Sequence, residues 1–119
     1  MGTRSTIQFK EDNEVLVSIY QQYDGYIEGV GKEIKDFINS KTFVNGINKP
    51  KKQFNGFGCF IAQFIKHFKS EAGGLYIISK NSCSEEYNYI IESKDNKIIV
   101  SCLGDKNYYQ EFNLKWKNK

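Results

Sequence analysis

Arg4, the only arginine of the chain, is the first residue whose type points to recognition of an anion. It is one of 17 cationic residues, all the others being lysine. Its fixed fork of N–H donors suits bidentate binding of a phosphate or carboxylate better than a lysine ammonium does. The alternative is an ordinary surface ion pair with one of the 14 acidic residues.

A second segment, residues 20–26, reads Tyr-Gln-Gln-Tyr-Asp-Gly-Tyr. Tyr26 could stack on a flat ligand, Gln22 and Asp24 could fix it by hydrogen bonds, and Gly25 would admit a close backbone approach. This pattern predicts a platform for a ring-bearing ligand. The alternative is a set of tyrosines that pack at a sheet edge beside an Asp-Gly turn.

A third segment, residues 55–59, reads Asn-Gly-Phe-Gly-Cys and opens a predicted helix. Glycines at a helix start leave backbone amides accessible, and the positive end of the helix dipole favours an anion. The spacing is not that of a Walker phosphate-binding loop. The alternative is that Asn55 caps the helix and the glycines permit close packing.

Cys59 in the first turn of that helix could act as a nucleophile with a lowered pKa, with Gln63 one turn further on. His67 lies two turns on, about 12 Å along the axis, so the helix alone does not build a Cys-His dyad. An ordinary structural thiol is the alternative.

The chain has three cysteines and one histidine, without the paired spacing of a zinc site or a disulfide framework. We therefore expect no metal, no cofactor and a reducing, cytoplasmic location. We find no long apolar run or export signal, and expect no membrane association. The net charge of +3 is too small to predict a duplex nucleic acid binder.

The elements that must position these residues follow from periodicity. Apolar residues at helical spacing predict helices over residues 30–40 and 57–68, joined by a connector at 41–54. In the first helix Glu33 and Asp36 fall on the solvent face, and in the second His67 falls at the rim of the core face. Alternating residues predict six strands, the last three in an antiparallel meander. These strands are at residues 6–9, 15–20, 75–78, 87–91, 98–103 and 108–116.

The order ββααββββ predicts a single α+β domain over residues 1–119. Its expected architecture is an antiparallel sheet of about six strands with two helices packed on one face. The tail at residues 115–119 reads as frayed. We expect the first strand, the glycine-rich turn and the start of the second helix to meet at one end of the sheet.

Three motifs together resemble a family of small, uncharacterised proteins of bacteria, phages and large DNA viruses. They are Met-Gly-Thr-Arg-Ser at 1–5, Tyr-x-Gln-x-Asp-Gly-Tyr at 20–26 and Asn-Gly-x-Gly-Cys-x-x-Ala-Gln at 55–63. The resemblance covers residues 1–92 and supplies no reaction. It implies that seven residues belong to one site: Arg4, Gln22, Asp24, Tyr26, Asn55, Cys59 and Gln63.

These observations favour a non-catalytic protein that binds a small anionic, nucleotide-like ligand and forms a homodimer or higher oligomer. If the chain is encoded by a phage or virus, it would capture a nucleotide immune signal in the host cytoplasm. The alternatives are a small-molecule hydrolase or transferase that uses Cys59, and a protein-interaction module that uses the final aromatic strand. Stacking of single-stranded nucleic acid on the tyrosines is a further alternative.

Overall fold

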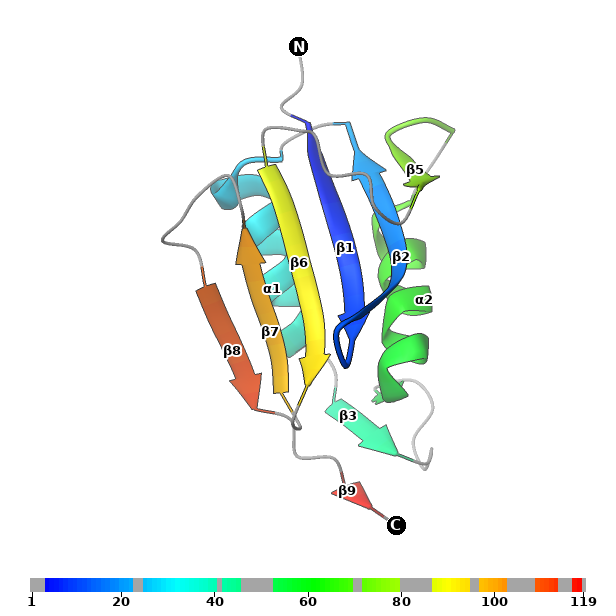
Figure 1. Ribbon diagram of the computed structural model, residues 1–119, viewed down its shortest axis with the longest axis vertical. Coiled ribbons are helices and arrows are strands. Elements are labelled where there is room, and N and C mark those ends of the chain that lie inside the picture. The colour runs from blue at the N-terminus through cyan, green and yellow to red at the C-terminus, as the bar shows by residue number, and fades with distance from the viewer. Residues whose placement is uncertain are drawn as a thin grey trace.

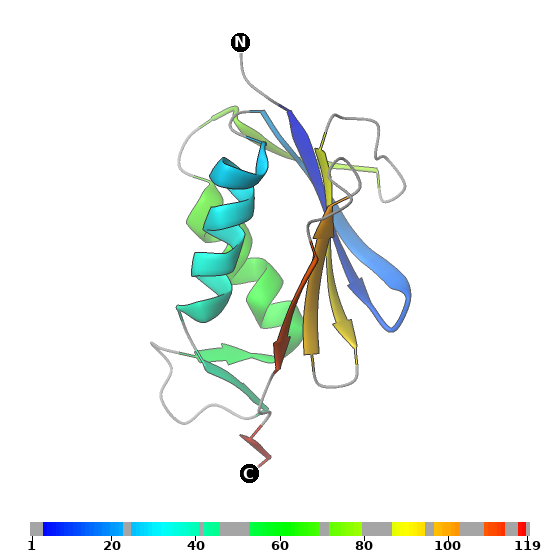
Figure 2. The ribbon, with the colours of Figure 1, turned by 90° about the vertical axis from the view of Figure 1, so that its left-hand side faces the viewer.

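The structure, a computed structural model, has an α+β architecture with both helices on one face of a six-stranded sheet (Figures 1 and 2). The predicted fold class is therefore confirmed. The residues that the structure describes are 4–22, 25–40, 42–45, 53–69, 72–79, 87–94, 97–102, 109–113 and 117–118.

The sheet is mixed, and the prediction of a purely antiparallel sheet is wrong. Its strand order is β5-β2-β1-β6-β7-β8, with the central strands β1 and β6 parallel. Both helices lie in the stretch of chain between these two strands, and a long crossover of this kind permits parallel pairing. The meander of β6, β7 and β8 is antiparallel, as predicted. The strands are β1 (Ser5–Glu11), β2 (Glu14–Gln21), β5 (Leu75–Ile78), β6 (Tyr87–Lys94), β7 (Lys97–Cys102) and β8 (Tyr109–Asn113).

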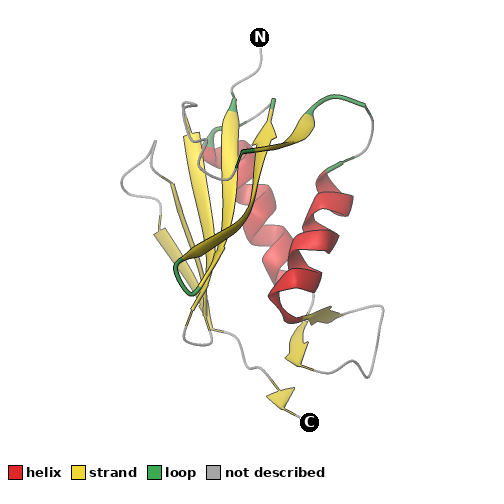
Figure 3. Cartoon of the chain, turned by 45° about the vertical axis from the view of Figure 1, so that its right-hand side comes forward, coloured by secondary structure: helices red, strands yellow, loops and turns green. Residues whose placement is uncertain are grey.

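The two helices lie side by side over the sheet (Figure 3). The first predicted helix consists of a π-helical turn at Ile27–Gly31 followed by α1 (Lys32–Asn39), so it begins earlier than the apolar spacing indicates. The second predicted helix is α2 (Gly56–Phe68). Its expected apolar face is confirmed, since four of its residues are buried, namely Phe57, Phe60, Ile61 and Phe64.

The predicted connector and the predicted frayed tail contribute instead to a second, three-stranded sheet. Its strands are β3 (Thr42–Asn45), β4 (Gln53–Asn55) and β9 (Lys117–Asn118), in the parallel order β4-β3-β9. Local turn residues hide this pairing, which depends on contacts far apart in the chain. Phe43 and Phe54, both buried, are the apolar signal within the connector.

Phe60 of α2 lies at the centre of an aromatic core and is fully buried. Its ring centroid is 5.0 Å from that of Phe54, 5.4 Å from that of Phe43 and 5.7 Å from that of Phe37. Phe9 of β1 packs edge-on against the same ring at 6.3 Å. The core therefore joins α2 to α1, to the second sheet and to the centre of the main sheet.

The direction of α2 decides which motif residues can meet. Lys69, directly after α2, donates from Nζ to the carbonyls of Gly73 and Leu75 at 2.8 and 2.9 Å. Leu75 pairs with Gln21 at the end of β2, so α2 ends beside the start of β1 and the end of β2 (Figure 1). A helix of 13 residues is about 20 Å long, so α2 begins near the opposite end of the sheet.

Candidate functional site

Arg4, Gln22, Gly25 and Tyr26 lie together where β1 begins and β2 ends, and we call this group the Arg4 end. Ser5 pairs with Gln21 across the two strands, which places Arg4 near Gln22. The backbone N–H of Gln22 donates to the Gly74 carbonyl at 2.8 Å and so anchors the end of β2 to the segment before β5.

Gly25 packs directly on the start of β1. A Cβ atom at this position would lie 2.8 Å from the Cβ of Ser5 and 2.9 Å from the Arg4 carbonyl oxygen. Contacts this short exclude any side chain, so only glycine fits there. Gly25 therefore approaches the chain's own backbone, and the expected close approach of a ligand to Gly25 stays a prediction.

One buried hydrogen bond fixes this turn to the main sheet, and two further buried polar atoms lie beside it. The Tyr89 hydroxyl of β6 donates to the Gly25 carbonyl at 2.7 Å, and the Tyr89 side chain is fully buried. Ser5 Oγ and Gln21 Oε1 are buried and have no hydrogen-bond partner among the residues that the structure describes. Buried polar atoms are nearly always paired, so these two leave unused hydrogen-bonding capacity directly beside the Arg4 end.

The side chains of the Arg4 end differ in exposure. Arg4 is exposed, Gln22 is half-buried and Tyr26 is 38% exposed. Arg4 forms no ion pair within the described ranges, so an anion could reach its guanidinium. Asp24, predicted to belong to the same site, lies outside the described residues.

Tyr20 packs against a neighbouring strand, as the alternative interpretation of residues 20–26 expects. It pairs with Tyr76 across β2 and β5, and the two ring centroids are 6.1 Å apart. The Lys69 ammonium lies 5.4 Å from the centroid of the Tyr76 ring. Tyr20 therefore packs at the edge of the sheet.

Asn55, Cys59 and Gln63 form a second group at the start of α2, which we call the helix-start group. Asn55 is exposed and occupies the N-cap position, but its side chain makes no capping hydrogen bond, so the capping alternative is wrong. Gln63 donates from Nε2 to the Gln53 carbonyl at 3.0 Å, and its Nε2 lies 3.3 Å from Cys59 Sγ. Gln63 therefore ties α2 to β4.

The Arg4 end and the helix-start group do not meet. The first lies beside the end of α2, whereas Asn55 and Cys59 lie at its beginning. The expectation that the first strand, the turn and the helix start converge at one end of the sheet is wrong. Apolar periodicity identifies the face that α2 buries, but it does not reveal which way the helix runs along the sheet.

Cys59 has no described base beside it. Its polar neighbour is the Gln63 amide, and an amide is not basic. The ring of His67 instead stacks on Phe37 of α1, with centroids 4.8 Å apart and planes at 29°. The described residues therefore assemble no Cys-His pair on α2.

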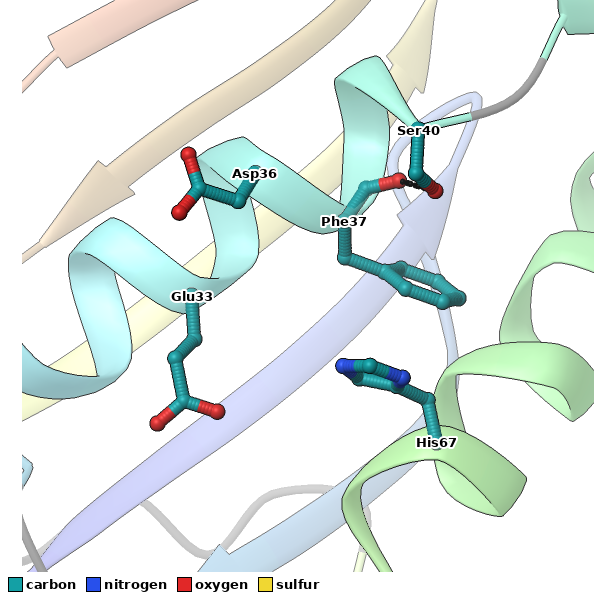
Figure 4. Close-up of a pocket in the computed structure, with 5 residues that line it drawn as sticks. All are labelled: Glu33, Asp36, Phe37, Ser40 and His67. Atoms are coloured by element: carbon teal, nitrogen blue, oxygen red, sulfur yellow. Dashed lines mark hydrogen bonds between the residues drawn. The ribbon is translucent and has the colours of Figure 1, made fainter.

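A cavity that the sequence analysis missed lies between α1 and α2 (Figure 4). Its volume is about 290 Å³, and its lining residues are Glu33, Asp36, Phe37, Ser40 and His67. Glu33, Phe37 and Ser40 are spaced i, i+4 and i+7, which places them along one stripe of the helix. This stripe is the sequence pattern that could have indicated the cavity, but the cavity forms only because α2 packs beside it.

Neither a metal centre nor a membrane helix is found in the parts of the chain that the structure describes. In those ranges no three His, Cys, Asp or Glu side chains are grouped so as to hold a metal ion. No helix within the same ranges has the length and apolar character to span a bilayer. Comparison with protein-family models, curated proteins and solved structures found no match for this chain. Membership of the family that the motifs resemble therefore stays a prediction.

Proposed function

We propose that this protein binds a small anionic, ring-bearing ligand at the Arg4 end and releases it chemically unchanged. The observation that carries the proposal is the seating of Gly25 on the backbone of Arg4 and Ser5, which gathers Arg4, Gln22 and Tyr26. A single guanidinium, an amide and an exposed aromatic ring are the groups that recognise a nucleotide-like ligand.

Each side chain has a distinct part in this proposal. The Arg4 guanidinium pairs in bidentate fashion with a phosphate or carboxylate. Gln22 supplies a donor and an acceptor for the polar edge of the ligand, and the Tyr26 ring offers a stacking surface. The sequence places Asp24 in the same turn, where its carboxylate would accept hydrogen bonds from ring or sugar donors.

The separation of the two groups gives the proposed oligomer a definite form. A ligand of nucleotide size cannot bridge the length of α2, about 20 Å at 1.5 Å per residue. For all seven motif residues to share one site, the helix-start group of one copy must lie against the Arg4 end of another. We include a homodimer or higher oligomer of this kind in the proposal. In a phage or virus, such a protein would capture a nucleotide immune signal.

Calorimetric titration with a panel of nucleotides, followed by recovery of the ligand, tests this function. We expect saturable binding of at least one nucleotide, its recovery unmodified, and a loss of affinity of at least tenfold in Arg4→Gln. Lys94→Gln removes the same charge at the far end of β6 and is the matched control. Equal affinity of both variants, or no binding across the panel, would contradict the proposal. A chemically altered ligand would instead favour the Cys59 enzyme.

A further inference from the structure

The cavity between α1 and α2 differs in charge from the Arg4 end. We propose that it is a second binding site, which takes a small molecule or side chain bearing a planar guanidinium cation. The inference goes beyond the proposed function, because it concerns other residues and a ligand of opposite charge. The volume of about 290 Å³ is near the lower bound of roughly 300 Å³ for small-molecule pockets and suits a group of this size.

The two carboxylates of the lining disfavour the binding of an anion in the cavity. Glu33 and Asp36 are both exposed, and neither forms an ion pair within the described part of the chain. In Figure 4 the Glu33 side chain and the His67 imidazole border the same space, while the Asp36 carboxylate points away from His67. Glu33 is therefore the direct partner for a cation, and Asp36 adds to the negative potential.

The remaining wall adds an observation independent of the carboxylates. The His67 ring is exposed and stacks on the buried ring of Phe37, so His67 is the aromatic ring that presents an open face to the hollow. A guanidinium is flat and weakly hydrated, and it packs on aromatic rings while its N–H groups bind a carboxylate. An ammonium lacks this planar geometry.

The cavity wall offers hydrogen-bond acceptors, which match a ligand that has only hydrogen-bond donors. Ser40 donates its hydroxyl proton to the Phe37 carbonyl at 2.6 Å, so the cavity is left with the lone pairs of its oxygen. A neutral imidazole offers one acceptor nitrogen, and a carboxylate offers acceptors alone. A guanidinium has five N–H donors and no acceptor, which is the complement of this wall.

An NMR titration of the full chain with N-acetyl-arginine amide tests the site. We expect saturable shifts at Glu33, Phe37 and His67. We also expect no such shifts with the uncharged isostere N-acetyl-citrulline amide, and weaker binding of N-acetyl-lysine amide. Glu33→Gln should reduce the affinity for the arginine probe about tenfold, the loss of one charge-assisted hydrogen bond. Glu14→Gln, at the exposed first position of β2, should leave it unchanged.

Equal shifts with the citrulline probe, equal affinity for the lysine probe, or equal effects of the two glutamate substitutions would overturn the proposal. If Glu33→Gln has the same midpoint of thermal unfolding as the original protein, its lower affinity for the probe does not result from unfolding. Nucleotide binding at the Arg4 end is read from different residues, so either site can fail without the other.

Discussion

Gly25 is the residue on which the shape of the Arg4 end depends. A methyl group at this position meets Ser5 Cβ and the Arg4 carbonyl at distances that no packed structure tolerates. We expect Gly25→Ala to lower the free energy of unfolding by about 1–3 kcal/mol, the usual range for overpacking, and to weaken nucleotide binding. Chemical denaturation and calorimetry measure the two effects.

Gly58 of α2 supplies the matched control for that substitution. Apart from its chain neighbours and the backbone of its own helix, no heavy atom of the described residues lies within 4 Å of the position that its Cβ would occupy. Gly58→Ala should therefore stabilise the protein by roughly 0.5–1 kcal/mol, because alanine loses less conformational freedom in a helix. If Gly25→Ala behaved in the same way, the packing described for the turn would be wrong.

Tyr109 and Glu111 of β8 form an exposed pair whose titration is coupled. A hydrogen bond from Tyr109, together with one from Lys97, lowers the pKa of Glu111 below its ordinary 4.5. The hydrogen bond to Glu111 and the negative charge nearby raise the pKa of Tyr109 above 10.0. The stability that Glu111 contributes is present above pH 4.5 and is lost as the pH falls through its lowered pKa. The contribution of Tyr109 is present below pH 10.0 and is lost as the pH rises through its raised pKa.

Glu111→Gln tests this coupling at the Tyr109 ring. We expect Tyr109 to lose its proton at a lower pH in this variant, because the hydrogen bond to a charged acceptor and the nearby charge are both removed. NMR signals of the Tyr109 ring followed against pH measure the change. An unchanged titration in Glu111→Gln would show that the two side chains do not interact in solution.

The residue types of the candidate site were predictable from sequence, but their grouping was only partly so. Arg4, Gln22 and Tyr26 lie close in space because their strands are joined by a short hairpin and a turn, both of which leave local signals. Asn55 and Cys59 were misplaced because their position depends on the direction of α2. No spacing of apolar residues encodes that direction.

Among the helices and strands, α2 contributes four buried side chains to the core, and Phe60 is the fully buried ring at its centre. We expect Phe60→Ala to lower the free energy of unfolding by about 3–5 kcal/mol, because the truncation leaves a cavity among rings from four other elements. Chemical denaturation measures this change. Ala62→Ser, on the exposed side of the same helix, is the control and should change the value by no more than about 0.5 kcal/mol. A similarly small change in Phe60→Ala would contradict the central place of this ring.

Local pattern and long-range pairing account for which elements were predicted. The hairpin of β1 and β2, the helix α2 and the final meander are encoded by neighbouring residues, and all three are confirmed. The small sheet of β3, β4 and β9 brings together residues more than 60 positions apart, as in the pairing of Val44 with Lys117. Turn-forming residues dominate the local signal there, so the pattern predicted a connector and a frayed tail.

At the scale of the whole molecule, the parallel contact between β1 and β6 joins the N-terminal hairpin to the C-terminal meander. The chain between them carries both helices and therefore closes the core over one face of the sheet (Figure 2). The Arg4 end and the α1–α2 cavity are lined by different residues. We therefore assign an anion to the Arg4 end and a cation to the cavity.

The oligomeric state is a prediction about the whole molecule. We expect light scattering to give at least twice the mass of one chain, because both motif groups can share a ligand only between copies. Mixing Arg4→Gln with Gln63→Ala should restore some nucleotide binding, since a mixed oligomer retains sites that are intact on both sides. A monomer that binds nucleotide with full affinity would remove the oligomer from the proposal and leave the Arg4 end alone.

An NMR titration with the tightest-binding nucleotide, mapped residue by residue, tests whether the ligand binds at the Arg4 end. We expect the largest shifts at Gln22, Gly25 and Tyr26, and unchanged signals from the residues that line the α1–α2 cavity. Largest shifts at Glu33 and His67, with none at Gln22, Gly25 or Tyr26, would contradict this expectation.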